Sequence, residues 1–160
     1  LGPVKDYHPI VGITQEAAVK YCDWLSRKTG KTVRLPTALE WEKAARGVDG
    51  RAYVWGNTYD PSYALTLDNR RKKAILPFWA PVGSCEYDRS VYGVLDMAGN
   101  AREWTASRFP FDSPFYQVKG ASASTTKRFL YCAYASDTAV VPTDIGFRYV
   151  VEVEQRSTGQ

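Results

Sequence analysis

The stretch VYGVLDMAGNAREWT, residues 91–105, decides how the rest of this chain is interpreted. It places two acidic residues, a Gly-Asn pair and a Trp in one short segment. Gly and Asn favour tight turns, and carboxylates beside such turns either bond to the backbone or bind a cation. The segment therefore has three possible roles: a reaction site, a metal-binding loop or a polar structural turn.

Length and composition predict one folded domain over residues 1–160. Hydrophobic residues make up 44% of the chain and charged residues 24%, which is typical of a globular protein with a core. Aromatic residues reach 14%, and large flat side chains of this kind can hold loop-rich folds together.

The charge pattern argues against nucleic-acid binding and membrane insertion. The net charge is only +4, and the densest basic run is NRRKK at residues 69–73, which is typical of a solvated turn. The sequence holds no apolar run long enough to cross a bilayer and no signal-peptide pattern at its start. The three cysteines, Cys22, Cys85 and Cys132, show no CxxC spacing, which favours reduced thiols and a cytoplasmic location.

Two helices are predicted in the first third of the chain. The first begins after Thr14, a favourable N-cap, and ends at Gly30; its apolar face contains Ala18, Tyr21, Cys22 and Leu25. The second covers residues 38–46, because Thr37 and Glu40 have the spacing of a capping box.

From residue 48 onward, helical periodicity gives way to short apolar pieces separated by Gly, Pro, Asn and Asp. This pattern predicts short strands and turns, with FRYVVEVE at residues 147–154 as the best strand. The sequence therefore predicts an α+β fold, in which two helices precede a loop-rich and mostly antiparallel β region.

The order of these segments resembles the formylglycine-generating enzyme (sulfatase-modifying factor) family over residues 8–151. Seven segments carry the resemblance, and in this chain they read HPIVGITQEAAVKYCDWLSRKTGK, RLPTALEWEKAARG, WGN, PVGS, YGVLDMAGNAREWT, VKGAS and IGFR. The resemblance implies a C-type-lectin-like fold, with two helices packed on a small twisted antiparallel sheet and long loops that carry the binding surface. Family members have a further strand-and-helix segment before HPIVG, so we expect this chain to be a fragment of a longer protein.

The active enzymes of that family use two cysteines that bind copper. Aligned from KGAS, the first cysteine position falls near Thr125, and aligned back from Cys132 it falls at Ser122; the second falls at Leu130 or Lys127. Copper(I) selects thiolate ligands, which none of these residues can supply. We therefore expect no copper cofactor, no catalytic residues and no formylglycine-generating activity.

The resemblance also implies one Ca²⁺ ion in the opening stretch. Its ligands would be the side chains of Asp96 and Glu103 and the carbonyl groups of Gly99 and Ala101, consistent with the preference of Ca²⁺ for oxygen. In the alternative interpretation, Asp96 and Asn100 only cap a turn, while Glu103 pairs with Arg102 or Arg108 on the outside. A second family Ca²⁺ site is expected to be missing, because Leu65 stands where that site needs Asn.

These features favour a binding or regulatory module over an enzyme. The sequence of residues 88–105 most resembles that of family members fused to bacterial serine/threonine kinases. The expected ligand is a protein or peptide. The alternatives are a variable protein of a diversity-generating retroelement, whose mutable codons exclude Lys, Glu, Gln, Met and Trp, and an active oxidoreductase. Residues 121–144 contain one residue of those five types, Lys127. The expected ligand-binding residues are Ser122, Ser124, Thr125, Phe129, Tyr131, Tyr134 and Asp137.

Overall fold

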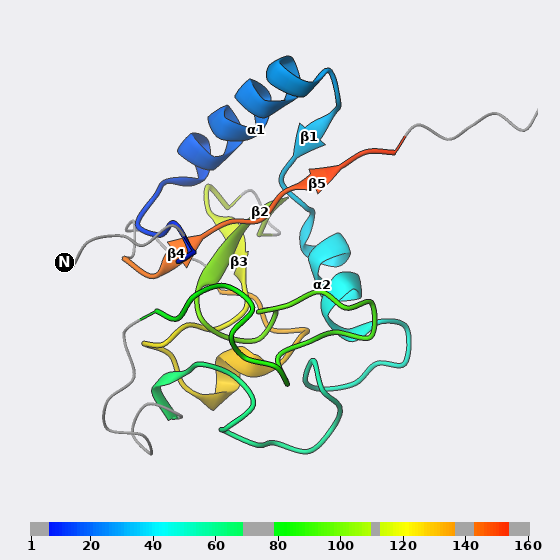
Figure 1. The fold of residues 1–160 in the computed structure, drawn as a ribbon, viewed down its shortest axis with the longest axis vertical. Helices are drawn as coiled ribbons and strands as arrows, with labels where there is room; N and C mark the ends of the chain where they lie inside the picture. Colours follow the sequence, from blue (N-terminus) through cyan, green and yellow to red (C-terminus); the bar gives the residue numbers. More distant parts are fainter. Residues whose placement is uncertain (1–6, 69–78, 110–112, 137–142, 154–160) are drawn as a thin grey trace, which may run out of the picture.

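The computed structural model describes residues 7–68, 79–109, 113–136 and 143–153. Two helices and two small sheets form an α+β fold, which confirms the predicted class (Figure 1). In Figure 1, helix α1 lies at one end of the molecule, the strands lie in the middle, and long loops fill the opposite end. The elements, in chain order, are α1 (Gln15–Thr29), β1 (Val33–Arg34), α2 (Ala38–Arg46), β2 (Arg102–Arg108), β3 (Tyr116–Lys119), the 3-10 helix η1 (Lys127–Leu130), β4 (Ile145–Gly146) and β5 (Val150–Val151).

Both ends of α1 lie where the sequence predicts them. The Thr14 hydroxyl accepts a hydrogen bond from the Ala17 amide at 3.1 Å, and Gly30 ends the helix in the left-handed conformation with φ 69°. Ala18 and Cys22 are buried, whereas Tyr21 lies at the edge of the packed face and contacts Phe147. The apolar face is therefore narrower than predicted.

The capping box of α2 is also confirmed. The Thr37 hydroxyl accepts from the Glu40 amide at 3.1 Å, and the Glu40 carboxylate accepts from the Thr37 amide at 2.8 Å. Glu40 additionally binds the guanidinium of Arg34, which bonds to Glu152 on its other side. These contacts connect the start of α2 to the β1–β5 pair.

The strands form two separate sheets rather than one. β1 and β5 make an antiparallel pair, while the other sheet has the order β3-β2-β4. β2 and β3 are antiparallel, but β4 runs parallel to β2, so this sheet is mixed rather than wholly antiparallel. β4 and β5 belong to different sheets, and residues 147–149 between them form no strand. The predicted strand at 147–154 is therefore reduced, within the described residues, to Val150–Val151.

Residues 48–101 fold as turns more than as strands. In the described part of this segment, the ladder contacts are isolated bridges, Tyr53 with Gly56 and Arg89 with Leu95. The predicted short strands are therefore wrong here. Apolar side chains from these turns nevertheless reach a core cluster under α2, which includes Trp41, Tyr53, Val54 and Met97. Burial of these side chains stabilises the loop end without regular strands.

A second core cluster joins α1 to the sheets. Its buried members are Ala18, Cys22, Val33, Leu35, Trp104, Val118 and Ile145. The Trp104 indole N–H bonds to the Ile13 carbonyl at 2.9 Å, so its one polar atom is satisfied inside the core. Neither helix of the described chain is long and apolar enough to cross a membrane.

The Glu40 contacts lead to a testable pH dependence. The Arg34 guanidinium, together with the Thr37 amide, lowers the pKa of Glu40 to about 2. Because the folded pKa lies below the unfolded value, this stabilisation is present above pH 4.5 and is lost as the pH falls through 2. The carboxylate side chain is 42% exposed, so solvent screening keeps the effect small.

We expect Glu40→Gln to lower the free energy of unfolding by about 0.5–1 kcal/mol at neutral pH, and the difference to vanish near the folded pKa of Glu40. Urea unfolding of both proteins across this pH range measures it. Glu86→Gln, at an exposed carboxylate outside the helices, is the control. A difference that persists unchanged in acid would contradict the assignment.

Candidate functional site

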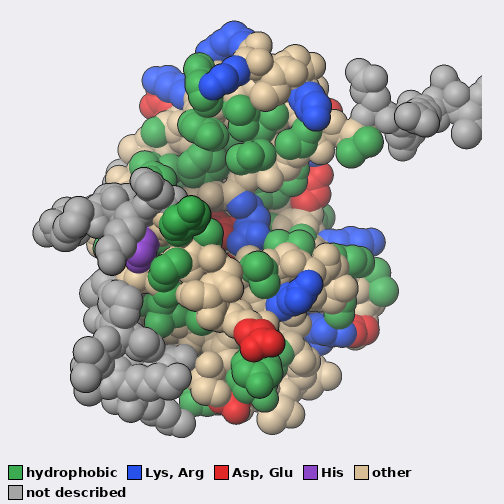
Figure 2. Space-filling model, viewed as in Figure 1, with side chains coloured by type: hydrophobic (Ala, Val, Ile, Leu, Met, Phe, Trp, Pro, Cys, Tyr) green, Lys and Arg blue, Asp and Glu red, His purple; other side chains and the backbone are tan. Residues whose placement is uncertain are grey.

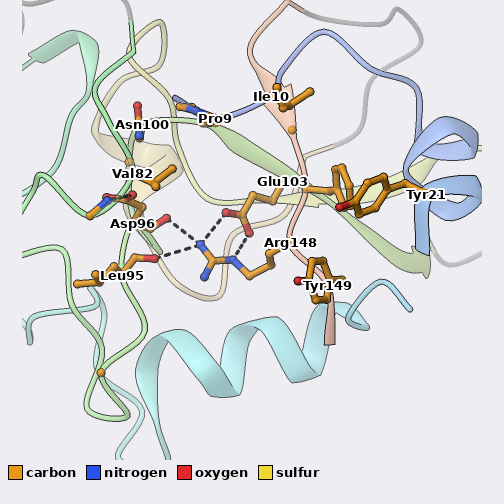
Figure 3. A pocket seen from close by; sticks show the side chains of 16 residues that line it. Pro9, Ile10, Tyr21, Val82, Leu95, Asp96, Asn100, Glu103, Arg148 and Tyr149 are labelled. Atoms are coloured by element: carbon orange, nitrogen blue, oxygen red, sulfur yellow. Dashed lines mark hydrogen bonds and ion pairs between the residues drawn. The ribbon is translucent and has the colours of Figure 1, made fainter. Parts of the chain in front are cut away.

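A pocket of about 820 Å³ opens between α1, the 82–101 loop and the chain after β4. Its wall is largely apolar, and its floor carries the charged groups of Asp96, Glu103 and Arg148 (Figure 3). Figure 2 shows basic and acidic side chains in a hollow among hydrophobic ones on this face. Asp96, Gly99, Ala101 and Glu103 all line the pocket, so the fold brings the four predicted metal residues together.

A buried carboxylate that the sequence did not single out holds the 97–100 turn. Asp88 is fully buried, and its two oxygens accept from the Ala98 amide at 2.8 Å and the Gly99 amide at 2.7 Å. Burial raises the pKa of Asp88 to about 7, against the effect of these two bonds. Gly99 is required for packing, because a Cβ there would lie 2.7 Å from the Leu65 backbone nitrogen.

The side chains of Asp96 and Asn100 bond to the neighbouring 80–83 loop. Asp96 has a left-handed backbone with φ 54°, and its carboxylate accepts from the Gly83 amide at 2.6 Å. The Asn100 side chain both accepts from the Ala80 amide and donates to the Ala80 carbonyl, each at 3.0 Å. Burial raises the pKa of Asp96. Both side chains thus hold turns in place, as the alternative interpretation predicted for Asp96 and Asn100.

Glu103 is the most fully engaged carboxylate of the site. It is 7% exposed, and one of its oxygens accepts from the Trp41 indole N–H and from Arg148 Nε, both at 2.6 Å. Its other oxygen accepts from Arg148 Nη2 at 2.7 Å. Glu103 does form an ion pair, but the predicted partners are wrong: it pairs with Arg148, not with Arg102 or Arg108.

As they are placed, two of the four predicted metal residues already accept hydrogen bonds through the oxygens that would bind the ion. Both Glu103 oxygens already accept charged hydrogen bonds, and the Gly99 carbonyl accepts from the Ala101 amide at 2.9 Å. In the described part of the chain, no three acidic, Cys or His side chains are grouped to hold a metal; the predicted set is of another kind, with two carboxylates and two backbone carbonyls. Leu65, at the second family site, is buried in the core.

A second buried ion pair lies beneath the predicted ligand-binding segment. Arg102 donates to both oxygens of Asp144, through Nη2 at 2.7 Å and Nε at 3.1 Å. Ser122 and Ser124 donate to the same carboxylate, the latter at 2.7 Å. Burial alone would raise the pKa of Asp144, but the bonds from Arg102, Ser122 and Ser124 together lower it.

This network changes the role of two predicted ligand-binding residues. Ser122 is 0% and Thr125 is 9% exposed, and the Thr125 hydroxyl accepts from the Ser122 amide at 2.7 Å. They hold the loop from beneath instead of offering side chains to a partner, which corrects that expectation. Ser124 is exposed and keeps one side toward solvent.

Three predicted aromatic residues do reach the surface. Tyr131 is 41% exposed and stacks on Tyr53 with ring centroids 5.0 Å apart. Phe129 and Tyr134 are half-buried and meet edge to face at 5.0 Å. We call Ser124, Phe129, Tyr131 and Tyr134 the aromatic face. Asp137, the remaining predicted member, lies outside the described residues.

The sequence analysis missed Arg148 and Asp144, whose bonding partners are distant in sequence. Arg148 is 45 residues from Glu103, and Asp144 is 42 from Arg102. Arg148 lies in the IGFR motif and Asp144 in the Thr-Asp pair before β4. Neither motif indicates which oppositely charged residue its member will contact in the fold. Nothing in the sequence around Asp88, other than its charge, indicated that it would hold the 97–100 turn.

A family model described as "Sulfatase-modifying factor enzyme 1-like domain" matches residues 3–153. The formylglycine-generating enzyme of Mycobacterium tuberculosis is 35% identical over 112 residues, which cover 64% of this chain and 34% of that protein. The mouse protein named inactive C-alpha-formylglycine-generating enzyme 2 is 34% identical over 121 residues, covering 71% of this chain and 37% of that protein. The relatives thus include both enzymes and a protein named inactive, and the chain spans about a third of their length.

Kinases and solved structures extend the comparison. The serine/threonine-protein kinase pkn1 of Chlamydia caviae is 35% identical over 112 residues, covering 69% of this chain and 15% of the kinase. PvdO of Pseudomonas aeruginosa has a TM-score of 0.78 at 23% identity and covers 94% of this chain and 64% of its own. Treponema denticola variable protein 1 has a TM-score of 0.73 at 19% identity and covers 93% and 73%. At these identities, the solved structures show a shared fold.

The placement of the three thiols predicts their reactivity. Burial raises the pKa of Cys132 to about 12 and also raises that of Cys22, and both thiols are buried, whereas Cys85 is partly exposed. Since the thiolate is the reactive form, a disulfide reagent at neutral pH should modify Cys85 rapidly and the other two only after denaturation. Spectrophotometric thiol titration measures this. Cys85→Ser should remove the fast phase and Cys132→Ala should leave it; fast reaction at Cys132 would contradict the prediction.

Proposed function

Because this chain belongs to the sulfatase-modifying factor enzyme 1-like family, we propose that it is a binding module without formylglycine-generating activity. The observation that carries the proposal is the residue content of the two positions aligned with the copper-binding cysteines. Ser122 or Thr125 stands at the first, and Lys127 or Leu130 at the second. None of these side chains can offer a thiolate, the ligand that Cu(I) selects.

The thiols that remain are poorly suited to replace the pair. Cys132 is buried behind the aligned segment, and its raised pKa keeps it protonated at neutral pH. Lys119 donates to the Cys132 carbonyl at 2.7 Å, so this part of the chain has a packing role. The similarity to the mouse protein named inactive supports the same proposal.

The aromatic face is the proposed contact surface for a protein or peptide ligand. Tyr131 rests on the buried ring of Tyr53, and the guanidinium of Arg128 lies 4.9 Å from the Phe129 ring centre. Rings held in this way lose little conformational entropy on binding, which makes exposed aromatic residues effective anchors. The Asp144 network beneath them adds rigidity to the same segment.

We further propose that the domain is part of a longer, kinase-type protein. This rests on the similarity to the Chlamydia caviae kinase, of which the matched region covers 15%. In such a protein, the aromatic face would select the partner and the kinase would act on it. Sequencing of the complete gene tests this arrangement.

A second candidate is a variable protein of a diversity-generating retroelement. The observation in its favour is that residues 121–144 hold only Lys127 among the five residue types that the mutable codons cannot encode. The similarity to Treponema denticola variable protein 1 extends to the fold alone. A template repeat and a reverse transcriptase gene beside this gene would support this candidate over the kinase arrangement.

Incubation with Cu(I), oxygen and a sulfatase-type cysteine peptide should leave the peptide unchanged. Mass spectrometry detects conversion of the thiol to an aldehyde, and a known formylglycine-generating enzyme in a parallel reaction is the positive control. Aldehyde formation above the copper-only background, lost on heating the protein, would contradict the proposal.

Peptides selected on the wild-type domain from a random display library should bind through the aromatic face. We expect Tyr131→Ala and Tyr134→Ala each to weaken the selected peptides about tenfold or more, as for an anchor residue. Tyr92→Ala, at a tyrosine that is exposed on the α2 side of the molecule, is the matched control. Equal losses in all three variants would place the contact elsewhere.

A further inference from the structure

The guanidinium of Arg148 contacts the carboxylate of Glu103, one of the four predicted calcium ligands, and two backbone carbonyls of the 95–96 turn (Figure 3). Its Nε and Nη2 donate to the two oxygens of Glu103 at 2.6 and 2.7 Å. Nη2 also donates to the Leu95 carbonyl at 3.1 Å and to the Asp96 carbonyl at 3.2 Å. One cationic group therefore contacts a carboxylate and two backbone carbonyls, which is the kind of oxygen set that a bound Ca²⁺ would gather.

The backbone at this point is shaped to present those carbonyls. Asp96 takes the left-handed conformation with φ 54°, which is uncommon for a residue other than Gly. Its side chain is held away by the Gly83 amide at 2.6 Å, and its carbonyl faces Arg148. The strained turn and the guanidinium thus fit one another without a metal.

Charge balance favours a single cation here. Glu103 is buried, and a buried carboxylate is costly unless a positive group compensates it. Arg148 supplies that charge in the two-pronged geometry suited to a carboxylate. A divalent ion bound to the same Glu103 oxygens would have to displace the guanidinium or bear its repulsion.

We propose that Arg148 is a built-in cation that fixes the 95–103 loop against β2 and α2, and that this domain holds the loop without Ca²⁺. The ion pair connects four parts of the chain: the 95–96 turn, Glu103 on β2, Trp41 on α2 and the segment after β4. The charge that compensates Glu103 thus comes from a side chain of the IGFR segment.

The first test uses the wild-type protein. Thermal unfolding should give the same midpoint in EDTA, in millimolar CaCl₂ and in MgCl₂, and calorimetric titration with CaCl₂ should show no saturable binding. Stoichiometric Ca²⁺ binding that raises the midpoint of the wild-type protein would overturn the proposal, and this test does not require any destabilised variant to fold.

The second test is a double-mutant cycle with Arg148→Met and Glu103→Gln. Removing one partner of a buried ion pair should lower the unfolding midpoint by roughly 10 °C, and the double variant should lose no more than the worse single variant. Lys20→Met, which removes the exposed pair with Glu16 on α1, is the control and should cost much less. Additive losses, or an unchanged midpoint in Arg148→Met, would show that the two groups do not act as a pair.

Discussion

The structure depends on the compensation of one buried carboxylate, Glu103. It lies in the middle strand of the mixed sheet, paired across to Lys119 on one side and to Gly146 on the other. Its position on β2 is fixed by these registers, so the charge cannot move toward solvent. The surrounding chain must therefore bring donors to it, and the Trp41 indole and the Arg148 guanidinium come from α2 and from the segment after β4.

The same requirement explains why the loop end is ordered with so few strands. Backbone amides in turns need acceptors when they are buried, and here carboxylates supply them. Asp88 accepts from two amides of the 97–100 turn, and Asp96 accepts from Gly83. Each contact fixes a loop segment that belongs to neither sheet. The aromatic core under α2 packs against these turns. Polar bonds set the loop geometry, while burial of rings such as Tyr53 supplies the driving force.

Local chemistry explains which features could be predicted from the sequence. The caps at Thr14, Gly30 and Thr37 involve residues three or four positions from their partners, so spacing alone identifies them. The resemblance likewise predicted that the four proposed metal ligands lie close together, and Asp96, Gly99, Ala101 and Glu103 do line one pocket. The parallel pairing of β4 with β2 depends on contacts between distant segments, which periodicity does not encode.

The Arg102–Asp144 pair determines the chemistry of Ser122 and the stiffness of the segment that carries the proposed contact surface. Ser122 stands at one of the positions aligned with the first family cysteine, and its hydroxyl donates to Asp144. A carboxylate whose pKa is lowered by Arg102 and two hydroxyl groups is a weak base, so it does not activate that serine. Each polar group in the network has a hydrogen-bonding partner within it. The network therefore stiffens the loop that carries the aromatic face. A surface preorganised in this way loses less conformational entropy when a ligand binds, which is the property that the proposed binding role requires.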